Sequence, residues 1–212
     1  MNRYIHISVI FLLLLASCAN RGQGPQGGPR DSIPPAILKE VPVNGTLNFN
    51  AKEILVYFDE YIQMNDVQKH VLISPPQQTP PEVKAIGKHM SVVFQEELQD
   101  STTYTIDFGA AICDYNEKTP LEGYVFSFST GDVIDSLAIS GTIYNAANLD
   151  PVTEVLVGIH RNPHDSAFTS LPFSRITRAN SEGHFTIHNI QPGTYRIYAL
   201  NDISRDYLYQ PG

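Results

Sequence analysis

The chain has 212 residues, enough for one large or two small domains, and its formal net charge is -8. An acidic surface repels phosphate, so nucleic acid is not expected as a partner. Tyrosine and phenylalanine are frequent, tryptophan is absent, and 14 glycines and 15 prolines punctuate the chain. This composition favours an all-β protein with many turns.

The first predicted element is an export signal over residues 1–17. Arg3 precedes an apolar run from Val9 to Leu15, which is too short to cross a bilayer because a membrane helix needs about 20 apolar residues. The run ends in Leu15-Ala16-Ser17-Cys18, which resembles the lipobox of bacterial lipoproteins. The resemblance implies cleavage before Cys18 and acylation of that cysteine, so that lipid holds the protein to a membrane. The alternative is a cysteine that falls at the end of the run by chance.

Acylation of Cys18 would also decide the state of Cys113, the other cysteine of the chain. No intramolecular disulfide could then form. We expect Cys113 to be buried as a small hydrophobic residue, and an intermolecular bridge is the alternative.

Residues 18–32 are rich in Gly, Pro and Gln and predict a flexible tether between the lipid and the first domain. Ala19 is not the aspartate that retains lipoproteins in the inner membrane. The acidic run that sends some Bacteroidetes lipoproteins to the cell surface is also missing. By resemblance to these families, we expect an outer-membrane anchor with the protein facing the periplasm.

From Ile33 onward the chain shows short runs of alternating apolar residues, separated by Pro, Gly and Asn. Side chains two apart on a strand share a face, so each run offers one stripe to a common core. The stripes are Ile54, Val56 and Phe58; Val71 and Ile73; Met90, Val92 and Phe94; Tyr104, Ile106 and Phe108; and Tyr124, Phe126 and Phe128. About seven strands at this spacing predict a β-sandwich.

Several ordered motifs in this region resemble the SbsA-type bacterial Ig-like domain. They are Val41-Pro42-Val43-Asn44-Gly45, the strand from Ile54 to Glu60, the segment from Leu98 to Thr105, and the strand from Phe126 to Gly131. We place this domain at residues 33–132. The resemblance implies a spacer or binding module, because the family has no shared catalytic residues.

Residues 132–136 predict a short polar hinge, and residues 137–212 a second sandwich with an inward stripe of Val155, Val157 and Ile159. The runs Gly183-His184-Phe185 and Ile190 to Tyr195 resemble the carboxypeptidase regulatory-like domain, a transthyretin-like or carbohydrate-binding-like sandwich; Ile190 replaces the usual leucine. Gly183 and Gly193 are expected in turns with positive φ. About five strands are expected here, where such sandwiches have about seven, so the domain is predicted to be incomplete.

The sequence predicts no catalytic residue, metal or cofactor. Asp59 and Glu60 are adjacent and point to opposite faces of a strand, while His184 and His188 are expected to be exposed. Residues 114–116 and 202–206 could begin calcium loops, but turns are the preferred interpretation. No nucleophile elbow, phosphate loop or dinucleotide fingerprint occurs.

Four serines lie in Asp-Ser triplets that resemble the O-glycosylation site of Bacteroidetes exported proteins. They are Ser32, Ser101, Ser136 and Ser166. The alternative is that Asp-Ser simply favours turns.

Two functional hypotheses follow from the sequence. The first is a non-enzymatic, lipid-anchored envelope protein that presents Ig-like sandwich modules for structural or protein-binding roles. The alternative is a carbohydrate-binding envelope lipoprotein, in which Tyr207 and Tyr209, the only exposed-looking aromatic pair, contact the sugar. The expected partner is accordingly an unidentified envelope protein or a glycan.

Overall fold

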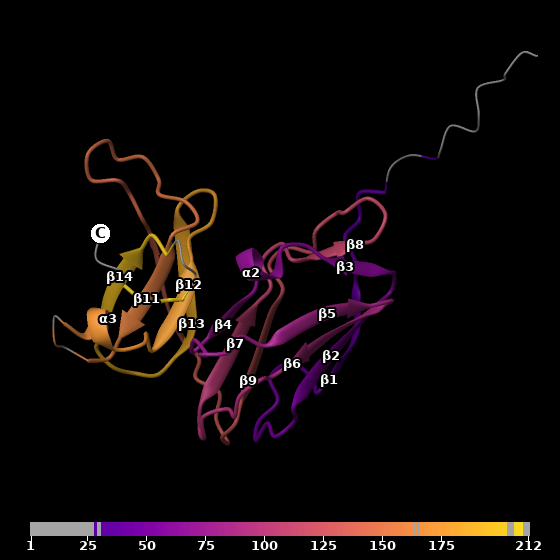
Figure 1. Ribbon diagram of the computed structural model, residues 1–212, viewed down its shortest axis with the longest axis horizontal. Helices are drawn as coiled ribbons and strands as arrows, with labels where there is room; N and C mark the ends of the chain where they lie inside the picture. The colour runs from indigo at the N-terminus through magenta and orange to yellow at the C-terminus, as the bar shows by residue number, and fades with distance from the viewer. Residues whose placement is uncertain (1–27, 29–30, 163, 165, 203–205, 210–212) are drawn as a thin grey trace, which may run out of the picture. The chain divides into compact units, whose positions relative to one another are not determined.

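The computed structural model describes residues 28, 31–162, 164, 166–202 and 206–209 (Figure 1). The chain divides into two units, Met1–Asp31 and Ser32–Gly212. All elements described below belong to the second unit. The predicted signal over residues 1–17 and the acylation site Cys18 lie outside the described residues.

The first sandwich consists of two antiparallel sheets (Figure 1). One sheet has the strand order β1-β2-β6-β5, and the other has the order β4-β7-β9. A further pair, β3 with β8, lies at one end, and the short helix α2 follows β3 in the chain. The bounds are β1 Ile37–Val41, β2 Glu53–Phe58, β3 Ile62–Met64, α2 Val67–His70, β4 Leu72–Ser74, β5 Glu82–Ile86, β6 His89–Val93, β7 Thr103–Asp107, β8 Ile112–Asp114 and β9 Val125–Ser129.

The predicted apolar stripes form the core of this sandwich. On β2, Ile54, Val56 and Phe58 are buried, while the alternate residues Leu55 and Tyr57 are half-buried on the opposite face. Three of the predicted stripe residues lie at the margin of the core and are partly buried: Val71, Phe94 and Tyr124. The alternation of the sequence therefore predicted the inner face of the sheets correctly.

Aromatic rings fill the centre of the core. The ring of Phe128 lies 4.1 Å from that of Phe49 and stacks on that of Tyr104 at 5.3 Å. The Tyr104 hydroxyl accepts a hydrogen bond of 2.9 Å from the backbone N–H of Gln99. This bond satisfies the one polar group of an otherwise buried ring.

The second sandwich is smaller. It pairs β10 (Leu137–Thr142) with β13 (His184–Ile190), and β11 (Leu156–His160) lies between β12 (Arg175–Arg178) and β14 (Arg196–Leu200). A short helix, α3 (Ala167–Ser170), precedes β12. The described part of the chain thus contains five strands after Ser136, as predicted, and the all-β fold class is confirmed.

The core of this sandwich uses only part of the predicted stripe. Val157 and Ile159 pack with Ile187 and Ile190, whereas Val155 is half-buried. All five residues of β11 are buried, which differs from the alternation that the sequence suggested. The strand is covered on both faces, because Leu156 belongs to a separate apolar cluster.

The two turn glycines behave differently. Gly183 has a φ of +77°, and a Cβ there would lie 2.9 Å from the carbonyl oxygen of Ile143, so this turn requires glycine. Gly193 does not have a positive φ, and that part of the prediction was wrong. Within the described residues, no helix has the length and apolar character needed to cross a membrane.

Candidate functional site

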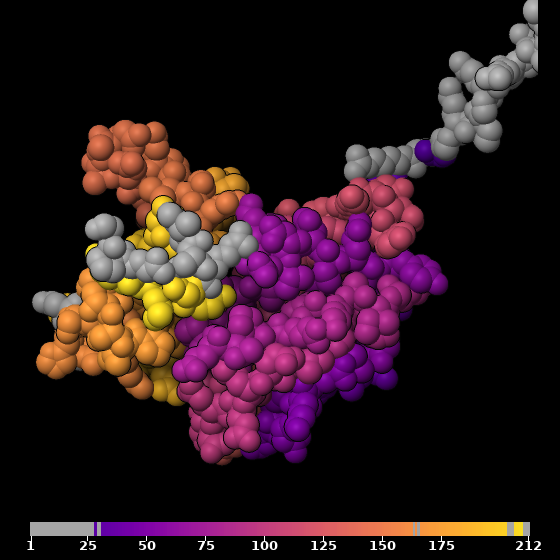
Figure 2. Space-filling model, in the orientation of Figure 1, coloured from indigo at the N-terminus to yellow at the C-terminus, as the bar shows by residue number. Residues whose placement is uncertain are grey.

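The outer face of the β4-β7-β9 sheet is the most unusual surface of the first sandwich. Alternation predicts that Thr103 and Thr105 face water, yet both are buried, as are their neighbours Tyr104 and Ile106 on the strand. The second sandwich covers this face, with β12 against β4 and β13 against β7. In Figure 2 the orange and yellow atoms of the second sandwich lie directly against magenta atoms of the first.

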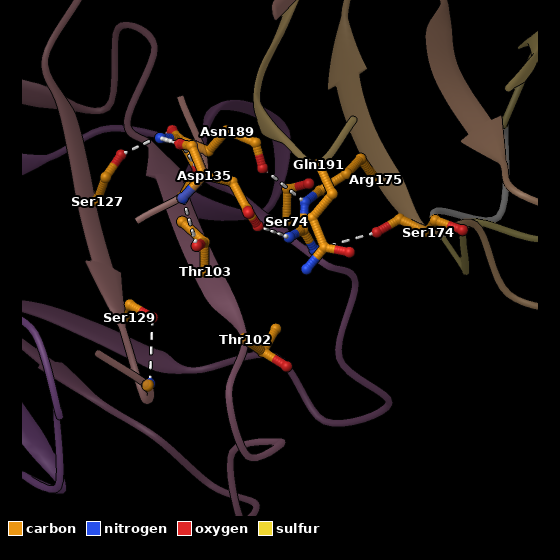
Figure 3. A network of polar contacts seen from close by, with 12 residues as sticks. Ser74, Thr102, Thr103, Ser127, Ser129, Asp135, Ser174, Arg175, Asn189 and Gln191 are labelled. Atoms are coloured by element: carbon orange, nitrogen blue, oxygen red, sulfur yellow. Dashed lines mark hydrogen bonds and ion pairs between the residues drawn. The ribbon is translucent and has the colours of Figure 1, made fainter. Parts of the chain in front are cut away.

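Asn189, near the end of β13, is the centre of the polar contacts between the sandwiches (Figure 3). Its side-chain Oδ1 accepts hydrogen bonds from Thr105 Oγ1 at 2.9 Å and from Ser127 Oγ at 3.1 Å. Its Nδ2 donates to the carbonyl oxygen of Asp135 at 2.7 Å, and its own carbonyl accepts from Arg175 Nε at 3.2 Å. One side chain therefore joins the first sandwich, the connecting segment and the second sandwich.

The backbone conformation at position 189 also favours asparagine. Its φ is +57°, a left-handed conformation that asparagine tolerates better than most residues other than glycine. An alanine at this position would lose the hydrogen bonds and would also strain the backbone.

The sequence predicted a short polar hinge at residues 132–136, and the structure bonds this segment to both sandwiches. The backbone N–H of Asp135 donates to Thr103 Oγ1 at 3.0 Å. Its Oδ2 lies 3.6 Å from Arg175 Nη2, and both side chains are largely buried, with exposed fractions of 14% and 10%. Among the described residues, this carboxylate oxygen has no hydrogen-bond partner.

Burial lowers the pKa of the Arg175 guanidinium, and the negative charge of Asp135 opposes this shift. The two buried groups depend on each other, because removal of either one leaves the other as an uncompensated buried charge. The pair therefore favours a single arrangement of the connecting segment.

An apolar contact and a weaker ion pair complete the interface. Leu72 of β4 packs with Leu156, Phe173 and Ile176 of the second sandwich. The backbone N–H of Ile176 donates to the buried Ser74 Oγ at 3.0 Å. Lys69 on α2 and Glu154 form an exposed ion pair of 3.0 Å; such pairs contribute little to stability.

The four candidate glycosylation serines, Ser32, Ser101, Ser136 and Ser166, are all exposed. They lie outside the strands, and Ser166 directly precedes α3. A modifying enzyme could therefore reach each of them, and their modification stays a prediction.

The two tyrosines near the chain end do not share one exposed platform. Tyr207 is half-buried against the cluster that contains Leu72 and Phe173, and it lines a cleft of about 520 Å³. Tyr209 is 38% exposed, and its ring meets the ring of Phe168 edge-on at 4.9 Å. The expectation that both tyrosines are exposed was wrong for Tyr207, because the apolar interface covers part of its ring.

The turn that follows β8 explains Asp114 without calcium. Its buried carboxylate accepts hydrogen bonds from the backbone N–H groups of Glu117 at 2.7 Å and Thr119 at 2.6 Å. Burial alone would raise the pKa of Asp114, but these bonds outweigh it and hold the pKa below its ordinary value. Among the described residues, no cluster of three or more His, Cys, Asp or Glu could hold a metal.

Cys113 and the two histidines His184 and His188 match their predictions, and a third histidine, His160, is buried. Cys113 is buried, and burial raises the pKa of its thiol; His184 and His188 are exposed. His160 is only 3% exposed and lies 4.7 Å from the ring of Phe173. Burial lowers its pKa, and in the described structure its Nε2 has no hydrogen-bond partner.

Comparison with known proteins identifies the first sandwich. Residues 31–130 match the family model described as a bacterial Ig-like domain, so the predicted Ig-like domain is confirmed. The match includes neither the lipobox nor the second sandwich. No curated protein matches the chain.

Several solved structures resemble the chain weakly. An L,D-transpeptidase from Mycobacterium smegmatis is 14% identical with a TM-score of 0.32, over 80% of this chain and 77% of that one. The N-terminal part of the bacterial S-layer protein SbsC is 12% identical with a TM-score of 0.31, over 80% and 45%. The major pilin subunit BcpA of Bacillus cereus is 10% identical with a TM-score of 0.23, over 78% and 58%. Likeness at this level carries no functional argument.

Proposed function

We propose that this chain, whose residues 31–130 form a bacterial Ig-like domain, is a non-enzymatic, lipid-anchored protein of the cell envelope. It presents two β-sandwiches as one stiff unit for structural or protein-binding roles. The observation that carries the proposal is the polar interface around Asn189, which ties the second sandwich to the outer face of the Ig-like domain.

The anchor is the lipid on Cys18. The motif Leu15-Ala16-Ser17-Cys18 supports cleavage after residue 17 and acylation of the cysteine. In this proposal residues 18–32, which are rich in Gly, Pro and Gln, connect the acylated cysteine to the first sandwich. The anchor lies in the outer membrane, and the protein faces the periplasm.

The interface determines the relative orientation in which the anchored sandwiches are presented. Two domains on a free hinge would offer their loops in many relative orientations. Here the connecting segment is bonded through Asp135 to both sandwiches, which supports one relative orientation. A partner that contacts both sandwiches would then lose less conformational entropy on binding.

The second sandwich is a carboxypeptidase regulatory-like module in this proposal. The buried cluster of Val157, Ile159, Ile187 and Ile190 supports a small sandwich. The exposed serines Ser32, Ser101, Ser136 and Ser166 carry O-linked glycans. Unmodified Ser32 and Ser136 peptides from the native host would contradict this last point.

Intact-mass analysis of the membrane-extracted protein tests the proposed anchor. We expect the native protein to lack residues 1–17 and to carry acyl chains, and the Cys18→Ala variant to lose them. Cys113→Ala is the matched control and should remain acylated, because Cys113 is buried in the Ig-like domain. An unacylated, soluble native product would overturn the proposal.

A further inference from the structure

A second cleft between the sandwiches, of about 350 Å³, has a charge opposite to that of the chain as a whole. Its polar lining includes Arg161, Arg175, Gln191 and Tyr195 from the second sandwich and Gln99 and Thr102 from the first. None of the described residues that line it is acidic. Two guanidinium groups in one cleft are unexpected in a chain with a net charge of -8.

Among the described residues, the groups that hold Arg161 in place are neutral. Its Nη1 donates to Gln191 Oε1 at 3.0 Å, and its Nη2 donates to the carbonyl oxygen of Pro192 at 2.8 Å. Its guanidinium lies 5.9 Å from the centre of the Tyr195 ring. None of the ion pairs found among the described residues includes Arg161, so within that part of the chain its positive charge is oriented by hydrogen bonds and is not paired with a carboxylate.

The loop over residues 191–195 is arranged around the Arg161 guanidinium. The Tyr195 hydroxyl donates to the carbonyl oxygen of Gln191 at 2.9 Å, which fixes the ring beside Arg161. A Cβ on Gly193 would lie 3.3 Å from Arg161 Nη2, so glycine allows the loop to approach closely. The side chain is therefore positioned before any ligand binds.

Arg175 supplies a second, partly compensated charge. Its Nε and Nη1 donate to the carbonyl oxygens of Asn189 and Ser174. The acidic group that acts on it is Asp135, whose Oδ2 lies 3.6 Å from Nη2. Figure 3 shows Arg175 between this carboxylate and the side chain of Gln191.

We propose that this cleft binds a carboxylate-bearing sugar residue. A guanidinium group matches a carboxylate in both geometry and charge. The amides of Gln99 and Gln191 and the hydroxyl of Thr102 can bond to sugar hydroxyls, and the Tyr195 ring offers an apolar surface. The volume suits one or two sugar rings, since it is at the lower end of the range for small-molecule sites.

The inference goes beyond the proposed function, because a stiff, anchored unit needs no ligand. It also places the sugar site away from Tyr209, which does not line this cleft. A negative result in the experiment below would not bear on the proposed lipid anchor, because the experiment uses the full chain in a soluble Cys18→Ala form.

The test is calorimetric titration with disaccharides of galacturonate and of glucuronate, at low salt. Neutral disaccharides of galactose and glucose, sodium acetate and inorganic phosphate are the comparison ligands. We expect saturable binding of an acidic disaccharide, at least tenfold tighter than any comparison ligand. It should weaken strongly in about 1 M salt, where the screening length falls to about 3 Å.

Arg161→Gln should weaken this binding by about 10- to 100-fold, since it removes a hydrogen-bonding charge. Arg161→Lys keeps the charge but loses the planar fork and should show an intermediate loss. Arg178→Gln is the matched control; Arg178 lies on β12 but outside the cleft, and binding should be unchanged. Equal thermal midpoints of the variants establish that each is folded.

Three results would overturn the proposal. They are no saturable binding of any acidic disaccharide, equal affinity in Arg161→Gln, or binding of acetate or phosphate as tight as that of the sugar. A peptide with a free C-terminal carboxylate that bound more tightly than every acidic disaccharide would also overturn it.

Discussion

The two faces of the β4-β7-β9 sheet are both covered by other parts of the protein, but through different chemistry. On the inner face, Ile106, Phe126 and Phe128 pack into the apolar core of the Ig-like domain. On the outer face, Thr105 and Ser127 bond to Asn189 of the second sandwich. Apolar packing is non-directional, whereas each outer contact needs one partner in one place.

The two faces therefore have different roles: one stabilises the Ig-like domain, and the other orients the second sandwich relative to it. The inner face provides the free energy that folds the Ig-like domain. The outer face adds less free energy, because a hydrogen bond replaces one with water, but an unmade bond there is costly. We therefore expect the inner face to determine whether the domain folds and the outer face to determine how the sandwiches are joined.

The largest expected effect is on the inner face. Phe128→Ala should lower the free energy of unfolding by about 3–5 kcal/mol, because it removes a fully buried ring and leaves a cavity. Denaturant unfolding measures this change. Tyr115→Ala, at a tyrosine that is 64% exposed, is the control and should change stability by less than about 0.5 kcal/mol. Similar losses in the two variants would show that the core is assigned wrongly.

The next effect is at the centre of the interface. Asn189→Ala should lower stability by about 1–3 kcal/mol, since the hydroxyls of Thr105 and Ser127 and the carbonyl oxygen of Asp135 each lose their hydrogen bond to Asn189. Asn189→Gly keeps the left-handed backbone without strain, so the difference between the two variants measures the backbone contribution. If Asn189→Gly unfolded at the same denaturant midpoint as the wild type, the Asn189 side chain would contribute nothing to stability.

A single outer contact should matter less. Thr105→Val should cost about 0.5–1.5 kcal/mol, because Asn189 Oδ1 still accepts from Ser127. Combined with Asn189→Ala, the loss should be smaller than the sum of the two single losses, since both changes remove the same bond. Strict additivity in this double-mutant cycle would contradict the described contact.

The smallest effect depends on pH and concerns His160. Burial lowers the pKa of this side chain in the folded state, so the unfolded chain binds its proton more readily. The stabilisation is present above the ordinary histidine pKa of about 6.5 and is lost as pH falls below it. In thermal unfolding between pH 8 and 5, His160→Leu should reduce this acid sensitivity. His164→Gln, at an exposed histidine, should retain it; equal profiles of the wild type and His160→Leu would refute the assignment.

The inner face could be predicted from the sequence because a period of two needs only local information. Ile54, Val56 and Phe58 alternate with less buried residues, and the structure preserves that pattern. The outer face could not, because threonine and serine on a strand normally face water. Their burial depends on Asn189, which follows Thr105 by 84 residues.

The sequence did contain one signal that β11 is covered on both faces. Gly158 lies inside β11, where a glycine often indicates a close approach by another group. A Cβ at this position would collide with the ring of Phe173, which covers the strand from outside its sandwich core. The cleft around Arg161 had no such signal, because its lining comes from segments far apart in the chain.

The central claim is that the two sandwiches are presented as one stiff unit. Residual dipolar couplings of backbone amides, measured in one aligned sample of the full chain, test it most directly. We predict that couplings from residues 33–132 and from residues 137–200 fit the same alignment tensor, and that Asn189→Ala makes the two tensors diverge. Two different tensors in the wild-type protein would contradict the account.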